Sequence, residues 1–228
     1  MLCSKRISRA FQIGFATLSF VLLGATPLQA ELITWNLTWV FSGATPDGTL
    51  TVKLEDTATN TVQLTVDTTE VPPNPLDTEF VSELCLNLDP AFNPNTLSFA
   101  GPGFTYVKLL SLGTDAFKPD GDGKYDIEFS FYTSAEKPRL DDDKQAVFTI
   151  TRSTGLSAAS FKFPSAPAPG GSGPFLVAAH VQGIDHEEGS GWVTRGDGDH
   201  PIPEASTMLL FGSGLTGVLA VARRKIRF

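Results

Sequence analysis

Short segments in which apolar and polar residues alternate constrain the fold of this chain most. Alternation with a period of two is typical of β-strands that are buried on one face. It is found at residues 33–41, 50–54, 62–66, 125–131, 146–150 and 175–181. Turns rich in glycine and proline separate these segments, and no stretch with a helical period lies between them. The pattern therefore predicts an all-β domain, either a single antiparallel β-sandwich or a jelly-roll-like fold.

Further features of the strand pattern give more specific predictions. Residues 50–54 and 62–66 flank a short polar loop and predict a β-hairpin. Residues 80–88, 97–99 and 104–110 are further strand candidates, and residues 175–181 are the last good one. The apolar phase of the first strand places Trp35 and Trp39 in the core.

Two single residues in this region are open to more than one interpretation. Trp192 follows Gly189-Ser190-Gly191, so we expect it in a loop. There it would stack on a sugar ring, or fold back against the sandwich. Cys85 alternates in phase with Val81 and Glu83 rather than with the neighbouring leucines. We expect a small, half-buried residue, with a reactive thiol or a pairing between chains as the alternatives.

The N-terminal residues have the layout of a secretory signal peptide. Lys5, Arg6 and Arg9 precede an apolar stretch at residues 11–24, and Ala30 offers a small residue for cleavage before Glu31. We therefore predict a signal peptide over residues 1–30. An uncleaved first transmembrane helix is the alternative, although the apolar stretch is short for that role.

A second apolar stretch lies near the other end of the chain. Residues 205–222 form a run of 18 residues without a charge. As a helix this run would be roughly 27 Å long, close to the thickness of the hydrocarbon core of a bilayer. A basic cluster follows and predicts the cytoplasmic side: Arg223, Arg224, Lys225 and Arg227. A buried core helix and a plain single-span membrane anchor are the alternatives.

The same C-terminal residues resemble the PEP-CTERM sorting signal. The motif reads Pro203, Glu204, Ala205, Ser206, Thr207, with alanine at a position where proline is usual in the family. The apolar run and the basic cluster complete the resemblance. It implies export, a transient stay in the inner membrane, and processing by a membrane protease-transpeptidase called exosortase. It further implies a Gram-negative, exopolysaccharide-producing bacterium, with the protein ending at the cell surface or in the extracellular matrix.

The charge balance bears on the partners of the folded part. The chain has 17 Lys+Arg and 25 Asp+Glu. All the basic residues outside residues 31–203 belong to the two terminal signals. Residues 31–203 hold 10 basic and 24 acidic residues, which gives a net charge of −14. Such a surface disfavours nucleic acid and anionic lipid as partners. It is compatible with solubility outside the cell and with cation binding.

Few residues offer recognisable chemistry. Asp120 and Asp122 alternate with Gly121 and Gly123, and Asp126 follows shortly after. These three carboxylates can wrap Ca²⁺, although the loop departs from the EF-hand pattern and also suits a plain hairpin turn. Apart from this possible ion, the sequence calls for no cofactor. Residues 141–143, three consecutive aspartates, are more typical of a solvated loop. His180, His186 and His200 fit no zinc motif, and the chain contains no nucleophile elbow, phosphate loop or dinucleotide fingerprint.

Taken together, these patterns predict four regions. They are a signal peptide at 1–30, a β-domain at 31–193, a short stalk at 194–200 and a sorting signal at 201–228. We expect the β-domain to be a non-enzymatic structural or polysaccharide-binding module of an exported protein. The alternatives are a secreted hydrolase that acts on extracellular polysaccharide and a plain membrane-anchored protein.

Overall fold

The computed structural model describes residues 30–69, 79–120, 123–166, 173–184 and 189–196. Several predicted features lie outside these ranges. They are residues 1–29 of the predicted leader, Asp122, His186, His200 and the entire region 201–228. Among the described residues, no helix is long and apolar enough to cross a membrane. The predicted transmembrane helix at residues 205–222 thus stays a prediction.

The described chain is built from β-strands and three short 3₁₀ turns. The strands are β1 (Leu32–Gly43), β2 (Leu50–Ala58), β3 (Thr61–Asp67), β4 (Phe80–Leu86), β5 (Ser98–Ala100), β6 (Val107–Phe117), β7 (Tyr125–Phe131), β8 (Leu140–Asp141), β9 (Gln145–Thr151), β10 (Val177–Gly183) and β11 (Gly189–Arg195). The 3₁₀ turns are η1 (Pro94–Thr96), η2 (Pro102–Thr105) and η3 (Ala158–Phe161). The prediction of an all-β fold is confirmed for the described residues.

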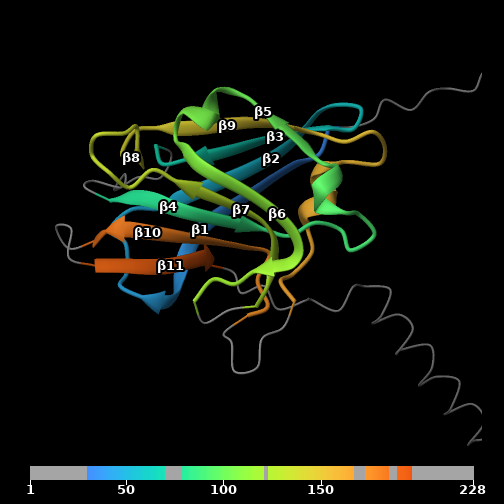
Figure 1. Ribbon diagram of the computed structural model, residues 1–228. Coiled ribbons are helices and arrows are strands. Elements are labelled where there is room, and N and C mark those ends of the chain that lie inside the picture. The colour runs from blue at the N-terminus through green and yellow to red at the C-terminus, as the bar shows by residue number, and fades with distance from the viewer. Residues whose placement is uncertain (1–29, 70–78, 121–122, 167–172, 185–188, 197–228) are drawn as a thin grey trace, which may run out of the picture.

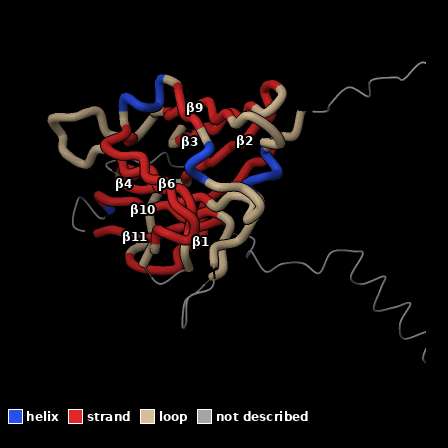
Figure 2. The backbone as a smooth tube through the Cα atoms, turned by 45° about the vertical axis from the view of Figure 1, so that its right-hand side comes forward, coloured by secondary structure: helices blue, strands red, loops and turns tan. Residues whose placement is uncertain are grey.

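All strands belong to one antiparallel sheet that curls on itself. Its order is β5-β9-β3-β2-β1-β11-β10-β4-β7-β6, and β8 pairs with β4 beside this path. In Figure 1, β9, β3 and β2 lie in the upper part of the domain and β10 and β11 in the lower part; Figure 2 shows the same curl from another side. The fold therefore differs from a sandwich of two separate sheets, because hydrogen bonds run without a break from one half to the other.

The first strand joins the two halves of the sheet. Residues Leu32 to Leu37 of β1 pair with β2, whereas Leu37 to Gly43 pair with β11. The pairing with β11 shifts register between Leu37 and Trp39 and again between Val40 and Ser42. Such bulges bend a strand and increase its twist, which lets a single strand turn a corner between two packed layers. The curl of the sheet thus follows from the irregular second half of β1.

The main core fills the space between the two halves. The ring of Phe129 on β7 lies 4.7 Å from that of Phe148 on β9 and 5.7 Å from that of Phe99 on β5. Around these rings pack the fully buried side chains of both halves, among them Leu54, Leu64, Leu84, Leu86, Ile150 and Val177. The hairpin predicted at residues 50–54 and 62–66 is present as β2 and β3, and it supplies one wall of this core.

A second, smaller cluster lies on the opposite face of β4 and β10. Cys85, Tyr125, Ala178 and Trp192 are buried there, and Phe41 and Phe117 pack against them. Both faces of β4 are therefore covered. The expectation that Cys85 is half-buried on a mixed face is wrong, since its exposed fraction is 1%.

Two further predictions about strands need correction. Residues 104–110 do not begin as a strand, because η2 covers residues up to Thr105 and β6 starts at Val107. The last described strand is β11 rather than β10. It reaches Arg195 and so extends two residues into the region predicted as a stalk.

Candidate functional site

A run of aromatic rings crosses the face of the sheet that carries the smaller cluster. We call Trp39, Phe175, Phe41, Trp192 and His180 the aromatic strip. The centroids of Trp39 and Phe175 are 5.2 Å apart, those of Phe175 and Phe41 5.0 Å, and those of Phe41 and Trp192 6.3 Å. Trp192 stacks on His180 at 4.7 Å with an interplanar angle of 12°. Each ring thus contacts the next, from β1 across β11 to β10.

The exposed end of the strip is Trp39. Its exposed fraction is 42%, against 4% for Trp35 on the same strand. The prediction that both tryptophans belong to the core is confirmed for Trp35 and wrong for Trp39. The register shift after Leu37 changes the phase of β1, so that the following residues no longer keep the alternation of residues 33–37. The ring of Trp39 meets that of Phe175 nearly perpendicularly, at 83°, which is a favoured aromatic geometry.

The loop predicted around Trp192 is absent, whereas one of the two alternatives for its side chain is confirmed. Trp192 lies within β11 rather than in a loop, and its exposed fraction is 8%. Its cross-strand neighbours are Ser42 on β1 and His180 on β10. The ring is therefore covered by the strip itself and is not presented to a sugar. Of the two alternatives, the structure supports the side chain packed against the domain.

The inner end of the strip is polar. Nδ1 of His180 lies 2.9 Å from Oγ of Ser82, and the same hydroxyl lies 3.2 Å from the backbone oxygen of His180. The pairing of β10 with β4 shifts register here, with His180 opposite Glu83 and Val181 opposite Val81. Ser82 therefore occupies a bulge, and its hydroxyl bonds fix the bulge against β10.

The ionisable groups at this end are perturbed in opposite directions. Burial lowers the pKa of His180 below its usual value, and the Asp120 carboxylate opposes this shift. Burial also raises the pKa of Glu83, and the neighbouring carboxylate of Glu128 adds to that rise. In both cases the buried environment disfavours the charged form.

Ser82 and His180 are residue types that form nucleophile and base pairs in hydrolases. The exposed fraction of Ser82 is only 3%, however. Its hydroxyl is also directed at a backbone carbonyl, as expected for a residue that stabilises a bulge. The hydrogen bonds of Ser82 thus hold β4 and β10 together at the bulge.

The predicted calcium ligands have separate contacts in the structure. Oδ2 of Asp120 accepts a hydrogen bond from Ser42 Oγ at 3.0 Å. Asp126 is buried, and its carboxylate accepts the backbone N–H of Leu88 at 3.0 Å and that of Asp115 at 2.8 Å. Asp122 lies outside the described residues. Within the described ranges no group of three or more potential ligands is close enough for a metal ion, and the calcium site stays a prediction.

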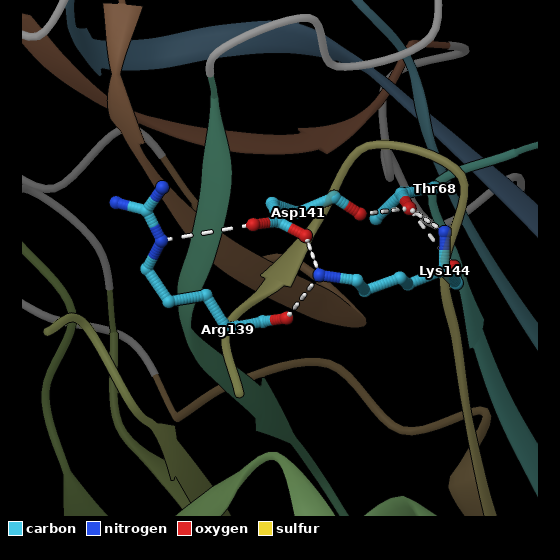
Figure 3. Close-up of polar contacts among 4 residues, drawn as sticks. All are labelled: Thr68, Arg139, Asp141 and Lys144. Atoms are coloured by element: carbon cyan, nitrogen blue, oxygen red, sulfur yellow. Dashed lines mark hydrogen bonds and ion pairs between the residues drawn. The ribbon is translucent and has the colours of Figure 1, made fainter. Parts of the chain in front are cut away.

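The three consecutive aspartates are partly built into the fold. Asp141 belongs to β8 and forms ion pairs with Lys144 and, at 3.6 Å, with Nε of Arg139. Thr68 Oγ1 donates to the backbone oxygen of Asp141 at 2.7 Å, and Lys144 N donates to Thr68 Oγ1 at 3.1 Å. Figure 3 shows these four residues as one connected set. The expectation of a solvated loop therefore does not describe Asp141, whose contacts hold the β8–β9 turn against the end of β3.

Comparison with known proteins gives one result for a limited part of the chain. No curated protein and no solved structure is significantly similar to this chain. Residues 201–225, in contrast, match the family described as the PEP-CTERM protein-sorting motif. The matched range includes the predicted motif at Pro203 to Thr207 and the basic residues up to Lys225. The resemblance stated from the sequence is thereby confirmed: this chain carries a PEP-CTERM protein-sorting motif, which implies export and sorting at a membrane.

Proposed function

We propose that this exported protein presents its β-domain at the cell surface or in the extracellular matrix, where the domain binds polysaccharide without catalysing a reaction. Residues 201–225 direct the sorting, and the aromatic strip supplies the binding surface. Trp39 is the residue that stacks on a sugar ring. This assignment replaces Trp192, which the structure buries.

The sorting part of the proposal rests on the matched motif. The uncharged run at residues 205–222 halts the chain in the inner membrane, and the basic cluster after it stays in the cytoplasm. Pro203 and Glu204 then lie just outside the bilayer, because proline favours an extended chain that a protease can enter. Exosortase processes the tail at this point. A plain membrane anchor differs from this proposal in keeping the tail intact.

One observation carries the binding part, namely that a large aromatic ring is exposed and yet fixed in position. Trp39 is 42% exposed, and its ring meets the buried ring of Phe175 edge to face. A ring that is already held in place loses little conformational entropy when a ligand covers it, which favours binding. Indole also offers an apolar face and an N–H donor, and sugars present apolar C–H faces bordered by hydroxyl groups. The net negative charge of residues 31–203 favours a neutral or cationic polysaccharide over an anionic one.

The chain offers a matched control for testing this role. Phe104 is 36% exposed, and its ring contacts buried Phe148 at 5.3 Å and 90°. It therefore resembles Trp39 in exposure and contact but belongs to η2, outside the strip. We expect Trp39→Ala in the full-length protein to weaken binding to the exopolysaccharide of its host about tenfold, which corresponds to about 1.4 kcal/mol. Phe104→Ala should leave binding unchanged. Equal affinity of the two variants, measured by affinity electrophoresis, would show that Trp39 has no role in binding.

The sorting part has its own test. Mass spectrometry of the surface-exposed protein should find a C-terminus within or close to the motif at residues 203–207. Glu204→Ala should spare membrane insertion and impair processing. If the surface form retains residues up to Phe228, the tail is only an anchor.

A further inference from the structure

The first residue after the predicted leader is held by several contacts. The backbone N–H of Glu31 donates to Asp56 Oδ2 at 3.4 Å, and the backbone oxygen of Glu31 accepts the N–H of Asp56 at 2.9 Å. The carboxylate of Glu31 forms an ion pair with Nζ of Lys162. Both backbone groups and the side chain of Glu31 are thus bonded, whereas Ala30 is exposed.

Asp56 is fixed on its other side as well. Its Oδ1 accepts the backbone N–H of Ala158, the first residue of η3, at 2.7 Å. The carboxylate therefore bridges the start of β1 and the start of η3 from its position on β2. A carboxylate that is already oriented by one short hydrogen bond is well suited to receive a positive charge at its second oxygen.

Removal of the leader changes the chemistry of Glu31 N. Hydrolysis of the Ala30–Glu31 peptide bond by water leaves a carboxylate on Ala30 and an amine on Glu31. A free α-amino group is largely protonated at neutral pH, so this nitrogen acquires a positive charge and three donor hydrogens. In the uncut chain the same atom carries a single, uncharged N–H.

We propose that the leader is removed between Ala30 and Glu31, and that the new α-ammonium group forms an ion pair with Asp56 that completes the fold. The inference rests on the export part of the proposed function and is independent of polysaccharide binding. Cleavage one residue later would remove all the contacts of Glu31. Cleavage further upstream would leave the neutral amide, whose hydrogen bond at 3.4 Å is long.

Asp56 is the carboxylate that contacts Glu31 N in the part of the chain that the structure describes. Glu55 on β2 is exposed, and Lys162 already pairs with the side chain of Glu31. The first and last turns of η3 contain no acidic or basic residue. Asp56 is therefore the group in position to neutralise the new terminus.

The test is a double-mutant cycle on the full-length exported protein. The first change is Asp56→Asn; the second inserts one glycine between Ala30 and Glu31, so that Glu31 N stays an amide and the charge moves away by about 3.8 Å. Mass spectrometry establishes the first residue of every variant. We expect Glu31 to be the first residue of the wild-type protein. We also expect Asp56→Asn to lower the Tm by about 2–4 °C more in the wild-type background than in the background with the inserted glycine. Glu55 is a neighbouring carboxylate on β2 without this contact, so Glu55→Gln should lower the Tm by the same amount in both backgrounds.

The possible failures are distinguishable. A wild-type N-terminus other than Glu31 would overturn the assigned cleavage position. Additive effects of the two changes, with Glu31 as the first residue, would overturn the ion pair alone. An exported protein that still begins at Met1 would contradict both this inference and the predicted leader, whereas loss of polysaccharide binding in any of these variants would bear on neither.

Discussion

The carboxylate of Asp126 allows the most quantitative test of the fold. The residue lies at the start of β7, and its exposed fraction is 8%. It accepts the N–H of Leu88, just beyond β4, and the N–H of Asp115, which has a positive φ of 48° within β6. Hydrogen bonds to a charged group contribute about 1.5–3 kcal/mol each. Because Asp115 is exposed and water can replace part of its bond, we expect Asp126→Ala to lower the free energy of unfolding by about 3–5 kcal/mol.

Urea denaturation followed by tryptophan fluorescence measures this loss. With a slope of about 2 kcal/mol per molar urea, the midpoint should fall by about 1.5–2.5 M. Asp126→Asn keeps one acceptor oxygen and should lose about half as much, which preserves the test if the alanine variant does not fold. Asp115→Asn is the control, because asparagine tolerates the same backbone conformation and retains the N–H donor. A loss below about 1 kcal/mol for Asp126→Ala would refute the idea that this carboxylate holds β4, β6 and β7 together.

Three further predictions concern the packing and the buried groups. Gly191→Ala should destabilise the domain by about 3 kcal/mol or more in the same assay, since its Cβ would lie 1.9 Å from the backbone oxygen of Ala44. A thiol reagent should label Cys85 only as fast as the domain unfolds, because the side chain is 1% exposed; rapid labelling of the native protein would contradict this burial. Glu83 has a folded-state pKa above the usual value of 4.5, so the folded state binds more protons than the unfolded state between these two values. The Tm should therefore fall as pH rises through that window, and Glu83→Gln should abolish this part of the fall, measured by thermal denaturation across pH.

Local alternation predicted the regular strands well. The segments that became β2, β3, β7, β9 and β10 were all identified, because each has one apolar face directed into the main core. Alternation failed where the backbone departs from a period of two. The register shift after Leu37 turned Trp39 outwards, and nothing in the local pattern of residues 33–41 indicates that shift.

The candidate site was less predictable, because long-range pairing creates it. Residues 189–195 contain two glycines and read as a loop, yet the close approach of Gly191 to Ala44 is what allows β11 to lie beside β1. Trp192 and His180 come together only through the pairing of β10 with β11, and Ser82 meets His180 only through a bulge. Sequence spacing contains no information about these contacts. The sorting motif, in contrast, is a linear signal and was identified from its residues.

The position of β11 in the sheet has a consequence for the timing of folding. This strand is the last of the described strands in the chain, but it lies between β1 and β10 and pairs with both. A chain that crosses a membrane with its N-terminus first exposes β1 early and β11 late, so β1 and β10 present unpaired edges in the interval. The range that matches the sorting family begins at Pro201, six residues after β11 ends at Arg195. If the tail arrests the chain as proposed, the strand that closes the sheet and the arrest signal emerge almost together, and a protein arrested a few residues earlier would be held at the membrane with its sheet still open.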